Sequence, residues 1–465
     1  MIAKNISQAG FSSFDGLHFT NGYHPLWQLL VSGLSYGVRD DSSLLLVTIL
    51  LGIILSIVSL LLIYLLLTKF RISPEWKAIS LLLGVFFILL PSWYALEPFL
   101  ATTLFLCSLY YYFQRYHDTS LKSQCVLGLL LSITVLARLD AIFVTPFFLL
   151  SLFIRTNKSD LKKLVALFYL ACFYAIPILI YVGLNLFYTG HLTPISGAIK
   201  SSFPEITISN LPLQLGYLVR VAPPVISSLC ITLTLVYTLA NQRQKIPPLL
   251  QDLLLINIGV LCFSGYEFLF QKDAMWGLRP WHFAIPNIVM LLSVAPVVSR
   301  FLPKSLPVLI IPLLILVNLI AVNQKFLTPT ATNPIKSDLF ATANWIRQNT
   351  TDDEVIAVTD PGVIAFFSGR KTISLDGLTN DFEYQKIVQK QKLQSYLNEN
   401  NVSYIGIFAR GHDTSLPVNH IQLKSRLFDS FDTLILEEGN RVFTSPYGSY
   451  SVWKNQINSQ ENSLQ

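Results

Sequence analysis

Seven ionisable residues lie inside or beside long apolar stretches of the chain: Glu97, Arg138, Asp140, Lys200, Glu267, Arg279 and His282. A charge at the centre of a bilayer costs about 2.5–3.5 kcal/mol on insertion scales, so such residues usually have a partner or a function. The planar fork of an arginine matches the oxygens of a phosphate, and a lysine offers a compact cation. These residue types therefore indicate a site for an anionic headgroup or a phosphate, with carboxylates close by.

Three of these seven residues have an equally simple structural explanation. Glu97, in SWYALEPFL, comes directly before Pro98 and can be an acid at the start of a helix. Arg138 and Asp140, in VLARLDAIF, flank a very short turn and can form a local ion pair there. Both explanations stay open beside the functional one.

The other basic residues of this set are candidates for the phosphate site. Lys200, in PISGAIKSSFP, is surrounded by small residues that would let a phosphate approach the backbone, although a lone loop lysine is more often solvated. Arg279 and His282, in GLRPWHFAIP, lie where aromatic residues commonly anchor a helix at the membrane interface.

The composition identifies the class of protein. The chain has 465 residues, of which 52% are hydrophobic and 13% are charged, against roughly 25% charged in a soluble domain. Runs such as 44–67 exceed the roughly 20 apolar residues of a spanning helix. The net charge of +6 does not indicate a nucleic-acid partner, because most basic residues lie in short loops between apolar runs. The chain is therefore expected to be an α-helical polytopic membrane protein.

Ten spanning helices are expected, at about 43–67, 77–91, 98–114, 121–137, 141–154, 164–187, 224–240, 250–269, 281–298 and 305–323. The shorter segment 25–38 fits an interfacial or re-entrant helix. The loop 188–223 is longer than a connector needs, which is typical of functional or disordered loops.

The distribution of Lys and Arg predicts the orientation. One set of loops holds thirteen of them: Lys69, Arg71, Lys77, Arg115, Lys122, Arg155, Lys158, Lys162, Lys163, Arg243, Lys245, Arg300 and Lys304. The opposite set holds five: Arg138, Lys200, Arg220, Lys272 and Arg279. The richer side should be cytoplasmic. With ten crossings, both the N-terminal loop and the C-terminal region are then expected to face outward.

The polar C-terminal region is expected to form a small α/β domain. Its predicted elements are a helix at 337–350, capped by Ser337 or Asp338, a strand at 354–358, a helix at about 381–400 and a strand at 402–408. Asp376 is expected in a local Asx-type turn. The predicted organisation is a partial outward loop with a juxtamembrane helix (1–42), a multi-spanning domain (43–323), the outward α/β domain (334–455) and a disordered tail (456–465).

Five segments occur in a recognisable order: AKNISQAGFSSFDGLHFTNGYHPLW, ALEPFL, ARLDAIF, GHLTPISGAIKSSFP and DPGVIAFFSGRKTISLDGLTND. Together they resemble the bacterial multi-pass glycosyltransferases of the GT-C superfold, relatives of protein mannosyltransferases and of the lipid A aminoarabinose transferase. The resemblance covers nearly the whole chain. It implies an enzyme of the inner or plasma membrane that moves a sugar from a polyprenyl-phosphate donor to a glycan, lipid or protein acceptor on the outer face.

The resemblance also implies roles for single residues. Glu97 matches an acidic position of the family and is the candidate catalytic residue. Arg138 and Lys200 match basic positions and are expected to bind the donor phosphate, and Arg279 and His282 are assigned to the same donor side. The residues expected on the acceptor side are Asn21, His24 and Asp140. No cofactor is implied, and a divalent metal is compatible with the reaction although the sequence shows no cluster of ligands for one.

The family pattern also has a spanning helix and an acidic motif just upstream of the position of Ile2, and neither occurs in this sequence. The chain is therefore expected to begin inside the first outward loop, through either a start codon assigned too late or a decayed gene. The first explanation implies a truncated reading of an active transferase, and the second implies a degenerate enzyme or a protein with a non-catalytic role. None of the residues named above is an obvious substitute for the missing acid.

Two other classes of protein remain open. A transporter would also have ten or more helices and ionisable residues near its centre, but transporters often show an internal repeat, and none is visible here. A non-catalytic membrane protein whose α/β domain binds a partner is the third class. Release of lipid phosphate from a labelled donor would separate the enzyme from both.

Overall fold

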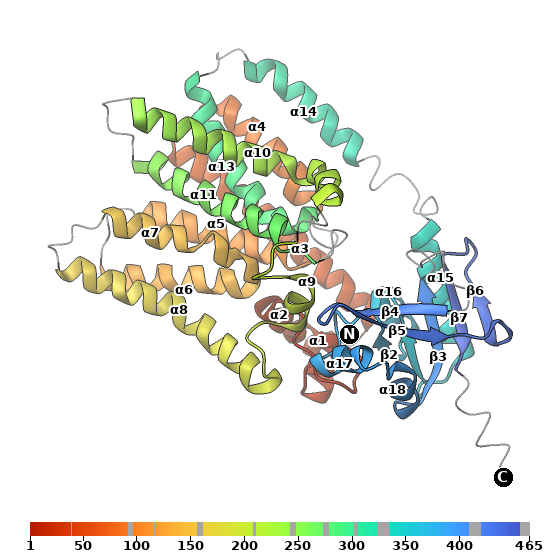
Figure 1. Cartoon of the computed structure of the whole chain (residues 1–465). Coiled ribbons are helices and arrows are strands. Elements are labelled where there is room, and N and C mark those ends of the chain that lie inside the picture. Colours follow the sequence, from red (N-terminus) through yellow and green to blue (C-terminus); the bar gives the residue numbers. More distant parts are fainter. Residues whose placement is uncertain are drawn as a thin grey trace, which may run out of the picture.

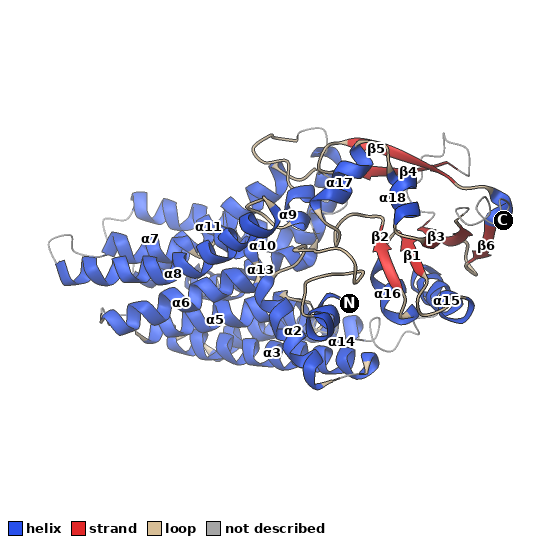
Figure 2. Ribbon diagram, turned by 90° about the horizontal axis from the view of Figure 1, so that it is seen from below, coloured by secondary structure: helices blue, strands red, loops and turns tan. Residues whose placement is uncertain are grey.

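The computed structural model describes residues 1–38, 40–91, 96–115, 118, 120–155, 161–207, 211–241, 248–272, 279–301, 306–322, 334–408 and 420–455. A bundle of helices comes first in the chain, and an α/β unit follows it (Figure 1, Figure 2). The N-terminus lies between these two parts in both views. The expected disordered tail, 456–465, lies outside the described residues.

The bundle begins with two short helices, α1 (Ile2–Ala9) and α2 (Pro25–Gly37). The following helices are α3 (Asp41–Lys69), α4 (Pro74–Gly84), α5 (Pro98–Gln114), α6 (Leu121–Ala137), α7 (Pro146–Arg155), α8 (Leu161–Thr189), α9 (Ile195–Lys200), α10 (Leu211–Asn241), α11 (Pro248–Leu269), α13 (Ala284–Phe301) and α14 (Leu306–Val322). A π-helical segment (Val85–Leu89) extends α4, and 3-10 helices precede α7 (Leu139–Phe143) and α13 (Pro280–Phe283).

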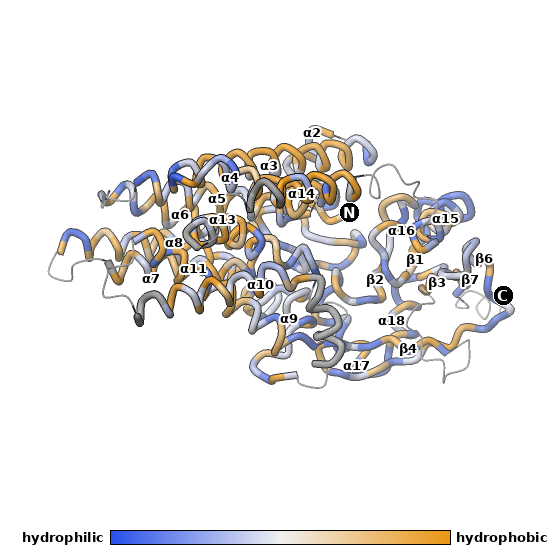
Figure 3. The backbone as a smooth tube through the Cα atoms, turned by 90° about the horizontal axis from the view of Figure 1, so that it is seen from above, coloured by the Kyte–Doolittle hydropathy of each residue, from blue (hydrophilic) through white to orange (hydrophobic). Residues whose placement is uncertain are grey.

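Each of the ten expected apolar segments falls on a described helix, and the expected short helix at 25–38 is α2. In the described part of the chain, four helical stretches are long and apolar enough to cross a membrane: Asp41–Lys69, Leu161–Thr189, Pro248–Leu269 and Pro280–Val297. Shorter apolar stretches lie at Leu121–Ala137, Leu139–Ile154, Val221–Tyr237 and Ile310–Ile320. Apolar residues follow the bundle helices in Figure 3. Ten crossings and their orientation stay predictions.

The expected loop 188–223 is largely helical, so this prediction was wrong. It contains the short helix α9 and the first part of α10, which continues through Pro223 and Pro224. A pair of prolines is typical of a helix start. Proline is nevertheless tolerated inside membrane helices, where neighbouring groups satisfy the freed carbonyls.

The bundle packs closely where a small residue allows it. A Cβ atom added at Gly128 of α6 would lie 2.5 Å from the carbonyl oxygen of Leu170 in α8. Small residues at such crossings let two helix backbones approach. Large side chains such as Phe105 and Phe148 then fill the core of the bundle beside them.

The C-terminal unit is built on a five-stranded sheet in the order β2-β1-β3-β7-β6. Its strands are β1 (Val355–Val358), β2 (Lys371–Ser374), β3 (Val402–Phe408), β6 (Arg441–Thr444) and β7 (Tyr450–Lys454). The first three are parallel, and β7 is antiparallel to both β3 and β6. A separate hairpin consists of β4 (His420–Ser425) and β5 (Ser430–Ile435). Its helices are α15 (Pro334–Asn349), α16 (Pro361–Ser368), α17 (Phe382–Gln389) and α18 (Leu393–Glu399).

The predicted strands 354–358 and 402–408 are confirmed as β1 and β3, but two details were wrong. The expected single helix at 381–400 breaks at Gln391, whose φ of 56° is incompatible with a right-handed helix. Asp338 does not cap a helix start, because α15 begins earlier, at Pro334. Its buried carboxylate instead accepts hydrogen bonds from the backbone N–H groups of Tyr447 (2.9 Å) and Ser449 (2.8 Å).

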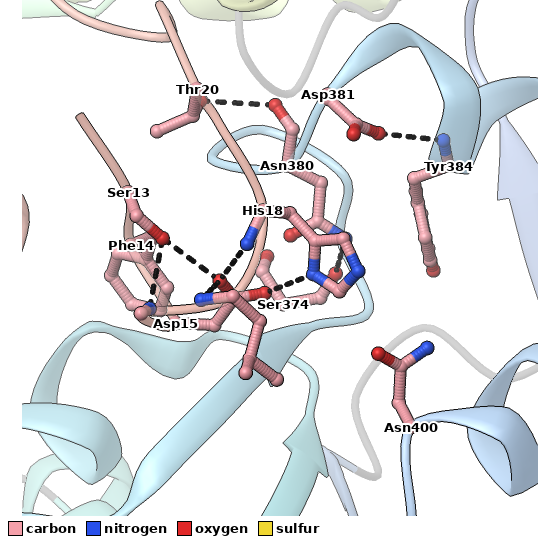
Figure 4. A network of polar contacts seen from close by, with 12 residues as sticks. Ser13, Phe14, Asp15, His18, Thr20, Ser374, Asn380, Asp381, Tyr384 and Asn400 are labelled. Atoms are coloured by element: carbon pink, nitrogen blue, oxygen red, sulfur yellow. Dashed lines mark hydrogen bonds and ion pairs between the residues drawn. The ribbon is translucent and has the colours of Figure 1, made fainter. Parts of the chain in front are cut away.

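The N-terminal loop 12–24 is fixed to the C-terminal unit by a polar network (Figure 4). The buried Asp15 carboxylate accepts hydrogen bonds from the N–H groups of Leu17 and His18, both at 2.8 Å, and lies 2.8 Å from Nδ1 of His18. The His18 ring packs against Tyr396 of α18, with ring centroids 5.6 Å apart. The Thr20 hydroxyl donates to the Asn380 carbonyl (3.0 Å). The loop therefore bridges the two parts of the chain.

The Asp15–His18 pair predicts a pH-dependent attachment of this loop. The hydrogen bond to Asp15 raises the pKa of His18 above its ordinary 6.5, so its contribution is full below pH 6.5 and is lost as the pH rises through the raised value. Burial raises the pKa of Asp15, but hydrogen bonds from His18 and Leu17 lower it below 3.8 overall. The carboxylate therefore stays ionised across this range. We expect hydrogen exchange of residues 12–20 to accelerate, relative to intrinsic rates, as the pH rises from below 6.5 through the raised pKa of His18.

The matched variant is His18→Gln, which keeps a hydrogen-bonding side chain without a titratable group. Its relative exchange rates should not change over the same range. A wild-type loop whose relative exchange is equally insensitive to pH would contradict the assigned ion pair.

Candidate functional site

The centre of the candidate site is a guanidinium held between two carboxylates. Arg138 ends α6, Glu97 precedes α5, and Asp140 lies in the 3-10 helix before α7. Arg138 Nε donates to both oxygens of Asp140 (2.9 and 2.8 Å), and one terminal nitrogen donates to Glu97 Oε1 (2.8 Å). The Arg138 side chain is 3% exposed. The pair with Asp140 is local, as the sequence suggested, whereas the contact with Glu97 joins segments 41 residues apart.

The charge balance of this cluster limits what Arg138 can do. One guanidinium faces two carboxylates, so the three groups together carry a net negative charge when ionised. A buried ion pair needs such close partners, because removing a charge from water is expensive. The contacts assign Arg138 to holding Glu97 and Asp140, and its expected contact with a phosphate stays a prediction.

His24 of the N-terminal loop closes one side of the cluster. The backbone N–H of Leu139 donates to His24 Nδ1 (3.1 Å), and His24 Nε2 lies 3.6 Å from Glu97 Oε1. Burial lowers the pKa of His24 to about 4, an effect larger than the opposing one of Glu97. The ring is therefore neutral at pH 7. Because Nδ1 accepts a hydrogen bond, the ring proton is on Nε2, on the side of Glu97.

Glu97 is ionised at neutral pH. Burial raises its pKa, but the neighbouring His24 and Arg138 together lower it by more, so the net value lies below the ordinary one. Within the described residues Arg138 donates to its Oε1, and no side chain donates to Oε2. One carboxylate oxygen of Glu97 can therefore accept a proton or a hydrogen bond from a bound molecule.

Lys200 approaches this cluster from α9, which begins at Ile195. Asn21 places that helix: its side-chain oxygen accepts from the Ile195 N–H (3.0 Å), and its amide donates to Asn185 of α8 (3.2 Å). Burial lowers the pKa of Lys200, whereas the nearby charges of Glu97 and Glu267 raise it. Among the residues that the structure describes, the Lys200 ammonium has no hydrogen-bond or ion-pair partner.

A second acidic group, Glu267, lies at the end of α11. It accepts a hydrogen bond from Gln271 Nε2 (2.6 Å), and its Oε2 lies 3.5 Å from Nδ1 of His282. Glu267 is 5% exposed, and its charge acts on both Arg138 and Lys200. Arg279 is turned toward Trp281, with the guanidinium carbon 5.7 Å from the ring centroid.

The structure thus brings most of the expected site residues together. Direct contacts join Glu97, Arg138, Asp140 and His24, while Lys200 and the Glu267–His282 pair lie within reach of their charges. Asn21 contacts α9 rather than the charged cluster. Glu267 had no role assigned from sequence, although its position in an apolar helix was a signal. Across the described ranges, no group of three or more His, Cys, Asp or Glu residues could hold a metal.

The central ion pairs predict a large loss of stability on truncation. Arg138→Ala should lower the free energy of unfolding by about 3–5 kcal/mol, because two largely buried carboxylates lose their counter-charge. Arg115→Ala is the matched control: that side chain is 61% exposed and 3.6 Å from Asp118, so its loss should be about 1 kcal/mol or less. Equal unfolding free energies for the two variants would contradict the assigned contacts.

Part of the chain matches a protein-family model, and nearly all of it is similar to a solved structure. Residues 330–453 match a family model described as Domain of unknown function (DUF8728), which covers the α/β unit. No curated protein sequence matches the chain. Among solved structures, the chain is similar to ArnT from Cupriavidus metallidurans bound to undecaprenyl phosphate, with 11% sequence identity and a TM-score of 0.52. The match covers 98% of this chain and 92% of that one. This likeness shows a GT-C-like fold.

Proposed function

We propose that the chain is a membrane glycosyltransferase that moves a sugar from a polyprenyl-phosphate donor to an acceptor on the outer face of the cell membrane. The observation that carries the proposal is the Lys200 ammonium, which is partly desolvated and has no protein partner among the described residues. A desolvated cation of this kind suits an anionic ligand. The GT-C-like fold supports the choice of ligand, since ArnT was solved with undecaprenyl phosphate bound.

In this proposal Lys200 contacts the donor phosphate and Glu97 faces the acceptor. The bond between the sugar carbon and the phosphate oxygen breaks, and the electron pair leaves with the lipid phosphate. The acceptor hydroxyl or amine forms the new bond to that carbon, and its proton passes to Glu97. The departing lipid phosphate is already a stable anion, so positioning and electrostatic stabilisation are the main tasks of the protein.

The other charged residues support these two groups. Arg138 orients Glu97 through Oε1, leaving Oε2 for the acceptor. The neutral His24 presents its Nε2 proton to the same carboxylate. Asp140 balances Arg138, and Asn21 places the helix that carries Lys200. We also propose that His282, paired with Glu267, lies on the donor side.

Release of labelled polyprenyl phosphate from a labelled polyprenyl-phosphate sugar tests the proposal. Lys200→Ala should lower kcat/KM by about 100-fold or more, as expected for removal of a group that stabilises transition-state charge. Glu97→Gln keeps the shape but not the proton acceptor, and should lower kcat by about 10²–10⁴-fold. Lys69→Ala, which removes an exposed lysine at the far end of α3, is the control and should leave both values unchanged.

Transport of the donor without its cleavage would contradict the proposal and favour a transporter. Normal cleavage of the donor by the Lys200→Ala variant would show that Lys200 does not belong to the site. The proposed type of reaction would then still stand.

A further inference from the structure

The turn of the β4–β5 hairpin reaches from the α/β unit to the loop that carries Lys200. Residues 200–202 run antiparallel to residues 270–272: the Lys272 N–H donates to the Lys200 carbonyl (2.8 Å), and the Ser202 N–H donates to the Phe270 carbonyl (2.7 Å). The Lys272 ammonium then donates to the carbonyl of Arg426 in the hairpin turn (3.1 Å). Lys272 therefore ties the backbones of Lys200 and Arg426 together.

An apolar contact strengthens the same junction. Ile195 and Ile199 of α9 are fully buried together with Phe382 of α17. Leu427, the residue after Arg426, packs against this cluster. In Figure 1 and Figure 2 α9 lies on the side of the bundle that faces the α/β unit. The residues next to Lys200 and next to Arg426 thus share one core.

The hairpin turn is also held from within its own unit. Gln385 Oε1 accepts hydrogen bonds from the Ser425 hydroxyl (3.1 Å) and from the Leu427 N–H (3.4 Å). The residues on both sides of Arg426 are therefore fixed. A long cationic side chain on such an anchored backbone loses less freedom on binding than one on a free loop.

Electrostatic effects agree with this geometry. After burial, which has the largest effect, the charge of Arg426 contributes to lowering the pKa of Lys200. Both cations also lie near carboxylates: the charge of Arg426 acts on Asp376, and those of Glu97 and Glu267 act on Lys200. A phosphate has enough oxygens for both, and arginine binds such oxygens through its planar fork.

We propose that Arg426, from the hairpin turn of the α/β unit, is a second cationic ligand for the phosphate group bound at Lys200. The C-terminal unit then completes the donor site instead of only covering it. This inference rests on the proposed function, because it assumes a phosphate at Lys200. The shared ligand chemistry is a phosphate group, carried either by a polyprenyl lipid or by free inorganic phosphate.

The test is equilibrium binding of labelled undecaprenyl phosphate to the full chain in detergent, with inorganic phosphate as competitor. Arg426→Ala should weaken binding about tenfold or more, and Arg426→Lys should recover part of the affinity because it keeps the charge. The matched control is Arg441→Ala, since Arg441 lies in the same unit and pairs with Glu438 on the surface. Its affinity should equal that of the wild type.

Thermal unfolding without ligand separates binding from folding. If Arg426→Ala fails to fold, the comparison of Arg426→Lys with Arg426→Gln decides, and equal affinities for these two variants overturn the inference. If inorganic phosphate competes with the labelled lipid, and the Arg426→Ala variant weakens that competition, the ligand is the phosphate group itself. An Arg426 effect without such competition identifies the lipid-linked form.

Binding measurements on these variants distinguish failure of this inference from failure of the proposed function. Weak binding by Lys200→Ala together with wild-type binding by Arg426→Ala overturns this inference and leaves the proposed function intact. Absence of binding to the unmodified chain overturns the proposed function, and the inference falls with it.

Discussion

The charge of Arg138 is the constraint on which the site depends. A guanidinium stays charged in proteins, so burying it to 3% exposure is costly unless carboxylates lie close to it, and Arg138 has two, Glu97 and Asp140. Those carboxylates belong to the start of α5 and to the 3-10 helix before α7, so the pairing determines how these helix ends meet. His24 is then added to the same cluster from the N-terminal loop. One electrostatic requirement therefore orders four segments of the chain.

The N-terminal loop extends this order to the α/β unit. Its residues contact, in turn, the C-terminal unit through His18 and Thr20, helix α9 through Asn21, and the Arg138 cluster through His24. Because α9 ends in Lys200, the position of the Lys200 ammonium is connected to both halves of the molecule. The cation that carries the proposed function is thus placed by contacts from outside its own helix.

The sequence predicted the apolar helices well, since long, strongly apolar runs have few alternatives to a helix in a membrane protein. Strands β1 and β3 were also predicted from the sequence. The pairing of Arg138 with Glu97, 41 residues away, could not be predicted from the sequence, because nothing in either segment specifies its partner.

The break at Gln391 and the remote hydrogen bonds of Asp338 also depend on tertiary contacts. Asp376 was expected in a local turn, yet its carboxylate accepts from the Asp360 N–H, 16 residues earlier. The candidate residues could be named from their types, whereas their roles needed the geometry.

The most direct test of the central claim is an experimental density map of the full chain in lipid nanodiscs with undecaprenyl phosphate. The account predicts density for the phosphate within about 3 Å of Lys200 Nζ, the usual length of a charge-assisted hydrogen bond. It also predicts that Glu97 stays paired with Arg138 in the same map. Phosphate density far from Lys200, or an Arg138 that leaves Glu97 to bind the lipid, would contradict it.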